Sequence, residues 1–431
     1  MVSIREPSKN TGWVSLVTAT VLLALPYALA ASTGTPAADA ATALPGIHSR
    51  AASIFCQSGL NPTGAIFMVE TVIFFFLALL AQRYGSRFGT LGAALQKDGM
   101  MIAALLALVC LPFFTAWQTD SSVCERGKAY FWESIFIDVF ILAILSISYN
   151  LLFGFTGIVS FGHAAFFGLG AYMVGIFIKF MGWNWWQAVL ATLLVGILVA
   201  LVKGVVGLRI RGLYFALFTL AFAEVFYLLA GNRLLVDITG AEDGFTFEVP
   251  DFLNTVKNRL FFYYLTLVVL VIAFLLVRRL MRSPTGQVLV ALRDNEDRAQ
   301  MLGFNTFYYK LVALALSGLL ATGAGILRGL AAKGASPNVL GVGFTFDPLL
   351  ATIIGGAGTF VGPVLGTGLM HLLEQSLRDT IFTIGSTEVN IGEHWALILG
   401  VTFIVIVLAF PRGIVGSLQS WWQRWRARQV K

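Results

Sequence analysis

The chain has 431 residues, of which 58% are hydrophobic and 12% are charged, and its formal net charge is +7. Soluble domains carry about 25% charged residues, so this composition excludes an ordinary soluble protein and predicts an all-α polytopic membrane protein. Three cysteines and four histidines, at these spacings, supply no framework for a metal site, and no glycine loop with a phosphate-binding lysine occurs.

Apolar runs of membrane-spanning length follow one another along the chain. About 20 apolar residues cross a hydrocarbon core of ~30 Å as a helix. We predict such helices at 12–31, 64–82, 99–117, 134–153, 156–180, 187–207, 212–231, 261–277, 309–330 and 395–411. The stretch 347–382 is interrupted by several glycines and Pro363, which predicts two short helices or a broken one. We therefore expect about 10-12 transmembrane helices, with broken or short helices near 154-172 and 347-382.

The distribution of Lys and Arg predicts the orientation of these helices. The basic residues between the apolar runs, with Lys203 counted among them, fall on one side if both termini are cytoplasmic. This orientation is typical of a multi-pass protein of a bacterial inner membrane. The first run ends near Ala30 in a pattern that resembles a signal-peptide cleavage site, so cleavage there is the alternative to a retained helix.

The loops that this orientation places outside are 32–63, 118–133 and 232–260, the last of which is acidic. Cys56 and Cys124 lie in the first two of these loops, where a disulfide can form. The sequence does not show that the two thiols approach each other, so a Cys56–Cys124 bridge and two unpaired thiols are both open.

Composition also predicts three parts of the chain. Residues 1-133 form an N-terminal extra hydrophobic region with about three transmembrane helices. Residues 134-416 form a core of apolar helices that contains a polar loop at 278-309, cytoplasmic in this orientation, and residues 417-431 form a basic cytoplasmic tail.

The loop at 278–310 is dense in charge although it separates two long apolar runs. Read as one short helix, residues 287–301 place Val288, Val290, Ala291 and Leu292 beside charged side chains, so that an apolar foot rimmed by charge would fit a cleft on another protein. Gly303 would end that helix. The alternative is a solvated loop whose charges only set the topology. The candidate docking residues are Arg293, Asp294, Asn295, Glu296, Arg298 and Gly303.

Five blocks of sequence carry a resemblance to a known family. They are NLLFGFTGIVSFGHAAFFGLGAY at 150–172, LRIRGLYFALFTLAFAE at 208–224, ALRDNEDRAQMLGFN at 291–305, GGAGTFVGPVLG at 355–366 and FPRGIVG at 410–416. In this order they resemble the permease subunits of branched-chain amino acid ABC importers, over about residues 134–416. The region 232–250 departs from the short Thr-Gly-Gly motif that the family often carries there.

The resemblance implies a transport subunit rather than an enzyme, coupled to ATPase subunits through the loop 283–305. It further implies a second permease subunit, two ATP-binding subunits, a periplasmic solute-binding protein and the surrounding lipid bilayer as partners. ATP and Mg would be bound by the partner subunits, with no cofactor in this chain. Leucine-type amino acids are the default solute, and urea or short amides are alternatives.

Residues for the translocation path are predicted from polar or glycine-rich interruptions of apolar helices. Such positions line a path or, equally, allow tight helix packing with internal hydrogen bonds. The candidates are Ser160, His163, Tyr172, Glu224, Gly355, Gly356, Gly358 and Thr359. A second function remains open: an ion-gradient-driven secondary transporter would use the intramembrane carboxylates Glu70, Asp138 and Glu224.

Overall fold

The computed structural model describes residues 104–115, 128–210, 212–256, 258–378, 381–384, 387–390, 395–418 and 421. Outside these residues lie the predicted helices at 12–31 and 64–82, the cleavage site near Ala30, Glu70, and the cysteines Cys56 and Cys124. The chain divides into two compact units, one made of residues 1–136 and 251–268 and the other of 137–250 and 269–431.

The described part of the first unit contains a helix at Ala104–Thr115, the 3-10 turn η5 (Asp251–Leu253), and the first residues of α6 (Lys128–Asn150) and α11 (Arg259–Arg282). The hydroxyl of Tyr263 donates to the carbonyl oxygen of Leu108 at 2.6 Å. Arg259 lies 3.5 Å from the centre of the Tyr130 ring and donates to the carbonyl of the same residue at 3.1 Å.

The second unit continues α6 and α11 and holds the remaining elements. In chain order they are η2 (Leu151–Phe155, a π-helical turn), α7 (His163–Lys179), α8 (Trp185–Gly207), α9 (Leu213–Ala230), η3 (Arg233–Leu235), α10 (Val236–Thr239), η4 (Ala241–Asp243), β1 (Phe245–Thr246), α12 (Pro284–Asp294), α13 (Glu296–Met301), α14 (Thr306–Ala332), β2 (Gly334–Ala335), η6 (Pro337–Leu340), α15 (Gly343–Gly355), α16 (Gly362–Arg378), β3 (Ile381–Ile384), β4 (Thr387–Asn390) and α17 (Trp395–Ala409). β1 pairs antiparallel with β2, and β3 with β4.

Six helical segments in the described part of the chain are long and apolar enough to cross a membrane. They are Tyr130–Phe155, Trp185–Gly207, Leu213–Ala230, Arg259–Arg282, Thr306–Ala332 and Ala396–Leu418. The prediction of an all-α polytopic membrane protein is confirmed. Local sequence explains where such a helix starts: Asn184 and Gln187 form a capping box at the first turn of α8, with the Asn184 amide donating to Gln187 Oε1 at 3.3 Å.

The core of the second unit is built where α7 packs against α14 and α8, and small residues allow this close approach. A methyl group added to Gly325 on α14 would overlap the carbonyl oxygen of Phe167 on α7. One added to Gly196 on α8 would come within 2.5 Å of the hydroxyl oxygen of Thr322 on α14. The backbones of α7 and α14 are therefore in direct contact, and the backbone of α8 lies against the side chain of Thr322; larger side chains at these glycines would prevent both contacts.

Two predicted spans are interrupted. The span predicted at 156–180 begins as a helix only at His163, because the π-helical turn η2 and an irregular segment with Gly157 at φ +76° precede it. The stretch 347–382 forms two short helices, α15 and α16, separated at Gly356–Val361, as one of the two alternatives predicted.

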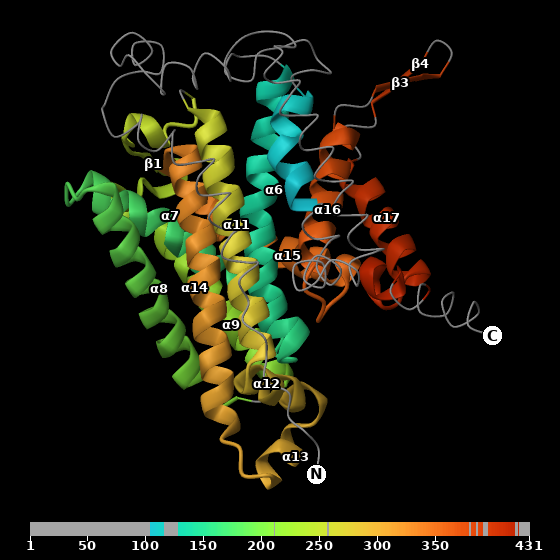
Figure 1. Ribbon diagram of the computed structural model, residues 1–431. Coiled ribbons are helices and arrows are strands. Elements are labelled where there is room, and N and C mark those ends of the chain that lie inside the picture. Colours follow the sequence, from blue (N-terminus) through green and yellow to red (C-terminus); the bar gives the residue numbers. More distant parts are fainter. Residues whose placement is uncertain are drawn as a thin grey trace, which may run out of the picture. The chain divides into compact units, whose positions relative to one another are not determined.

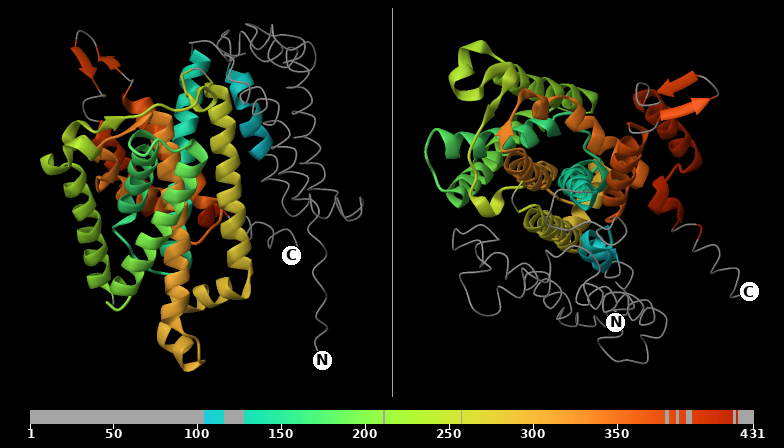
Figure 2. Two further views of the ribbon diagram at one scale, coloured as in Figure 1. Left: turned by 90° about the vertical axis from the view of Figure 1, so that its left-hand side faces the viewer. Right: turned by 90° about the horizontal axis from the view of Figure 1, so that it is seen from above.

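The elements of the second unit are distributed between two ends. Figures 1 and 2 show the long helices α6, α8 and α14 running in roughly the same direction. The short helices α12 and α13 lie at the lower end in Figure 1, and β1 lies near the upper end of α14. The charged loop is therefore separated from the β1–β2 pair by the length of the long helices.

Candidate functional site

The charged loop is folded into two short helices by its own polar side chains. Ser283 accepts a hydrogen bond from the amide of Gly286, and Pro284 follows it at the first helical position of α12. Asn295 ends α12, and its side chain accepts from the amide of Arg298 at 2.9 Å, which starts α13. The expected single helix at 287–301 is therefore wrong, because the cap at Asn295 breaks it in two.

The break changes which apolar residues are exposed. Leu289 and Leu292 of α12 are buried, so Leu292 does not belong to an exposed foot. The exposed apolar side chains lie farther along, at the end of α13 and just after it: Met301 is 87% exposed and Leu302 is 70% exposed. With Phe304, these two residues form a surface that we call the apolar tip.

Gly303 lies within the apolar tip and has a φ of +87°, with open space around its α-carbon. This conformation favours glycine and lets the chain turn sharply after α13. Asn305 then caps α14, because its side chain accepts from the amide of Tyr308 at 3.2 Å. Gly303 and Asn295 thus shape the loop.

The charged candidates of the loop differ in their surroundings. Asp294 and Arg298 are exposed. Glu296 forms an ion pair with Lys310 at 2.5 Å, which joins α13 to the first turn of α14. Arg293 is also exposed, but its guanidinium donates to the carbonyl oxygen of Gly154 in η2.

The loop between α15 and α16 lies beside the contact between Arg293 and Gly154. Asn150, the last residue of α6, accepts a hydrogen bond from the amide of Gly358 and donates one to the carbonyl of Thr359, both at 2.9 Å. A methyl group on Gly358 would come within 2.6 Å of the Arg293 guanidinium. The structure thus brings together Arg293, predicted for docking, and Gly358 and Thr359, predicted for the path.

The other glycines of this loop act through backbone contacts. A methyl group on Gly355 would overlap the carbonyl oxygen of Gly362, so α15 and α16 cross at their glycines. Gly356, at φ +118°, lies against the backbone of Gly413 in the FPRGIVG block. The hydroxyl of Thr359 accepts from the amide of Gly362 at 3.1 Å and donates to the carbonyl of Gly356 at 2.7 Å, so it closes the turn before α16.

A buried polar cluster surrounds the start of α7. The Nε2 atom of His163 lies 2.9 Å from the hydroxyl of Ser317 on α14, and Ser317 donates to the carbonyl of Ser148 on α6 at 2.7 Å. Lys203 of α8 is completely buried, and its ammonium donates to the carbonyl of Gly162 at 3.1 Å and to the hydroxyl of Ser160 at 3.4 Å. Ser160 and His163 therefore lie together in the helix core.

The two remaining path candidates are placed differently. Tyr172 is buried on α7, with its ring 5.8 Å from that of Phe245, and its hydroxyl has no hydrogen-bond partner among the described residues. Glu224 is exposed on α9, whereas Thr219, earlier on the same helix, is buried and accepts from the amide of Phe161 at 2.9 Å. It is Thr219 that faces the start of α7.

Two cations were missed or misplaced by the sequence analysis. Lys203 does not lie in a cytoplasmic loop; it lies inside α8, where its ammonium is 4.6 Å from the centre of the Phe166 ring. Arg328 of α14 forms an ion pair with Asp138 of α6 at 2.5 Å. Arg328 and Lys203 fall inside predicted apolar runs, as the already noted Asp138 does, so the cost of an intramembrane charge was the signal that could have identified these two cations.

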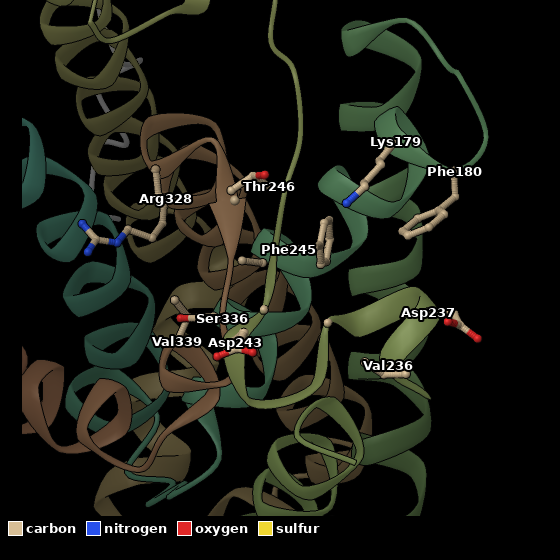
Figure 3. A pocket seen from close by; sticks show the side chains of 15 residues that line it. Lys179, Phe180, Val236, Asp237, Asp243, Phe245, Thr246, Arg328, Ser336 and Val339 are labelled. Atoms are coloured by element: carbon tan, nitrogen blue, oxygen red, sulfur yellow. The ribbon is translucent and has the colours of Figure 1, made fainter. Parts of the chain in front are cut away.

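A cavity of about 530 Å³ lies near the β1–β2 pair, lined by both signs of charge and by aromatic rings (Figure 3). The side chain of Lys179 points toward the ring of Phe245, and its ammonium is 5.3 Å from the ring centre. Asp237 and the guanidinium of Arg328 point away from this pair, and Asp243 lies below it in the view. The cavity is thus amphipathic.

Comparisons with known proteins agree with this arrangement. The family described as "Branched-chain amino acid transport system / permease component" matches residues 131–408. The permease protein LivM of the high-affinity branched-chain amino acid transport system of Escherichia coli (strain K12) is 24% identical over 81% of this chain and 84% of its own length.

Two further relatives extend the comparison. A probable branched-chain amino acid transport permease protein LivM of Methanocaldococcus jannaschii is 25% identical over 63% of this chain and 89% of its own. The autoinducer 2 import system permease protein LsrC of Salmonella paratyphi B is 28% identical over 64% of this chain and 77% of its own.

The apolar helical spans of the described residues define a multi-pass membrane protein, and the family match makes it a transport component. The chain belongs to the family of permease components of branched-chain amino acid transport systems. The family match begins close to the start of α6. It fully contains four of the five sequence blocks on which the resemblance was based, and the block at 410–416 follows it.

Proposed function

We propose that this chain is one permease subunit of an ABC importer for branched-chain or related small amino acids, and that the apolar tip is where an ATPase subunit binds. The chain would lie in the inner membrane with the apolar tip and both termini in the cytoplasm. Its partners would be a second permease subunit, two ATP-binding subunits that carry ATP and Mg, and a periplasmic solute-binding protein.

The observation that carries this proposal is the exposure of Met301 and Leu302 at the end of a charged loop. Folded proteins rarely gather exposed apolar side chains without a partner for them. The tip does not belong to an apolar run, so lipid is a poor partner for it. The ion pair between Glu296 and Lys310 holds α13 against α14. A displacement of the apolar tip by a bound ATPase subunit would therefore be passed to α14.

The cavity near the β1–β2 pair, which we call the outer cavity, has a lining that suits a small zwitterionic solute. Its lining combines the ammonium of Lys179 and the carboxylate of Asp243 with the rings of Phe180 and Phe245. A cavity of about 530 Å³ is within the range of small-molecule sites. We infer that it receives the solute released by the binding protein. The relatives include both LivM and LsrC proteins. We propose amino acids as the solute because of the similarity to LivM.

The ion-gradient alternative finds no such support. It required intramembrane carboxylates: Asp138 is paired with Arg328, Glu224 is exposed on α9, and Glu70 lies outside the described residues. The family match also favours the importer. Uptake that continues in the presence of a proton and sodium ionophore but stops on ATP depletion would agree with the importer.

The direct experiment is co-purification of ATPase subunits with the tagged chain from native membranes. Met301→Asp places a charge in the apolar tip, and Leu234→Asp serves as the control because Leu234 is also exposed, at 89%, but lies in η3 near the outer cavity. Burying one such apolar side chain is worth about 1.5–3 kcal/mol, so we expect at least about tenfold less ATPase with Met301→Asp and no change with Leu234→Asp.

The opposite pattern would sink the proposal. If the wild-type chain brings down no ATP-hydrolysing subunit from membranes in which its own complex is intact, the importer assignment fails. If Met301→Asp retains the ATPase as fully as the wild type, the docking surface lies elsewhere in the loop.

A further inference from the structure

Arg293 occupies an unusual place for a residue of a charged surface loop. It lies in the last turn of α12, yet its guanidinium donates to the carbonyl oxygen of Gly154. Gly154 belongs to η2, the π-helical turn that ends the α6 span. The side chain therefore joins the loop that carries the apolar tip to the first glycine-rich interruption.

The guanidinium also lies beside the second interruption. A methyl group on Gly358 would come within 2.6 Å of its Nη1 atom and 3.0 Å of the Gly154 carbonyl oxygen. A methyl group on Gly157 would come within 3.0 Å of Arg293 Cγ and 3.3 Å of its α-carbon. Gly157 and Gly358 both have a φ of +76°, a conformation that favours glycine, so both backbones can turn beside the arginine.

Asn150 completes the connection. It bonds both Gly358 and Thr359, and a methyl group on Gly154 would come within 2.5 Å of the Gly358 amide nitrogen. Four residues from separate parts of the sequence thus share one contact: Asn150, Gly154, Arg293 and Gly358. We call this group the arginine clamp.

We propose that Arg293 is a positioning residue that transmits displacement of α12 and α13 to both glycine-rich interruptions at once, and that it does not bind the ATPase. The inference rests on the proposed function. A planar guanidinium with several fixed donors can hold one carbonyl and lie flat against a second backbone, so it connects two segments rigidly. When the apolar tip is pushed, η2 and the loop 356–361 move with α12.

The clamp predicts a separation of docking from transport. Without the guanidinium, α12 still carries the apolar tip and still binds the ATPase, but its displacement no longer reaches the interruptions. Solute uptake per ATP hydrolysed should therefore fall while assembly is unchanged. A residue with a merely stabilising role would lower the amount of complex and leave this ratio intact.

The test uses the complete complex in reconstituted membranes, with labelled leucine and the solute-binding protein supplied. The variants are Arg293→Ala, Arg293→Lys, Asn150→Ala and the double variant Arg293→Ala/Asn150→Ala. Arg282→Ala is the matched control, because Arg282 is an exposed arginine at the end of α11 in the same loop region. Three quantities are measured: ATPase subunits bound per chain, ATP hydrolysed and leucine taken up.

We expect Arg293→Ala to bind the ATPase subunits as the wild type does and to lower uptake per ATP by about tenfold, within the usual range of coupling between sites. The double variant should be no worse than Arg293→Ala within about twofold, since both residues act on the same loop. Arg293→Lys, which keeps one donor for Gly154, should keep more of the ratio than Arg293→Ala. Arg282→Ala should match the wild type.

Two results overturn the inference. If Arg293→Ala leaves uptake per ATP unchanged in the complexes that form, the clamp transmits nothing, whatever its effect on abundance. If it releases the ATPase subunits to the same degree as Met301→Asp, Arg293 is a docking residue. Failure of the proposed function itself is visible separately, because the wild-type complex would then contain no ATPase subunit.

Discussion

The contact between α7 and α14 gives a sharp prediction, because two of the four glycines of α14 have very different surroundings. Gly323 has no atom within 4 Å of the position that a methyl group would take. At Gly325 the methyl group would overlap the Phe167 carbonyl oxygen, and it would lie 2.8 Å from the Phe167 carbonyl carbon and 3.1 Å from the α-carbon of Gly170. We therefore compare Gly325→Ala with Gly323→Ala.

Both substitutions gain about 0.5–1 kcal/mol of helix propensity, so this gain cancels in the comparison. What remains is the overpacking at Gly325, where backbone atoms of α7 cannot rotate away. Such overpacking costs about 1–3 kcal/mol. At about 2 °C per kcal/mol for a chain of this size, Gly325→Ala should unfold about 2–6 °C below Gly323→Ala.

The assay is thermal unfolding of the purified chain in one detergent, followed by size-exclusion fluorescence, with the wild type measured alongside. Gly323→Ala should be equal to the wild type or slightly more stable. Equal midpoints for the two variants would refute the close backbone contact between α7 and α14 on which the description of the core depends.

Three further substitutions test individual contacts. Thr359→Val keeps the shape of the side chain but removes the hydroxyl bonded to the amide of Gly362, so the thermal midpoint should fall by about 2 °C for a lost cap of about 1 kcal/mol; an unchanged midpoint would contradict that cap. Gly303→Ala forces a side chain into a φ of +87° at a strain of about 1 kcal/mol, which predicts about fivefold faster proteolysis at the apolar tip, whereas an unchanged cleavage rate would show that the turn adapts freely. Glu296→Lys should lower ATPase co-purification, and adding Lys310→Glu should restore part of it through a pair worth about 0.2–1 kcal/mol; a swapped chain no better than the single variant would mean that the pair does not hold α13.

The long helices could be predicted because their cause is local. An apolar run between polar residues defines a span, and the run at 187–207 corresponds to α8 at Trp185–Gly207. The interruption of 347–382 was likewise visible, since glycines and Pro363 weaken a helix wherever they occur. A break near 154–172 was expected from its glycines, but the helix starting at His163 was still placed too early, because the sequence does not show that the turn at Gly157 delays its start.

The site was less predictable because its residues are defined by distant partners. Arg293 and Gly154 are far apart in the sequence, and an arginine in a charged loop reads as a surface residue when no partner is known. The apolar tip was misplaced for a different reason. In one continuous helix, the period of about 3.6 residues would decide which of residues 287–301 share a face. The cap at Asn295 instead ends α12 and starts a new helix with a new direction.

Lys203 shows the limit of a rule based on charge counts. The distribution of basic residues assigns each lysine to a loop, yet Lys203 lies within the apolar run that forms α8, and its ammonium is held by Gly162 and Ser160. The cost of exposing an ammonium to lipid directs it inward instead. Giving the apolar run more weight than the charge of Lys203 would have placed this residue in the helix core.

The backbone contact between Gly413 and Gly356 has a consequence for biosynthesis. A chain made from its N-terminus reaches residue 356 well before it reaches the FPRGIVG block, so the loop between α15 and α16 is left open on that side until the last helix has been inserted. A chain that stops before Phe410 contains every residue of the arginine clamp but lacks the segment that closes over Gly356. The contact at Gly356, directly after α15, thus forms only when the segment after α17 has been made. An unfinished permease therefore differs from a finished one beside the arginine clamp.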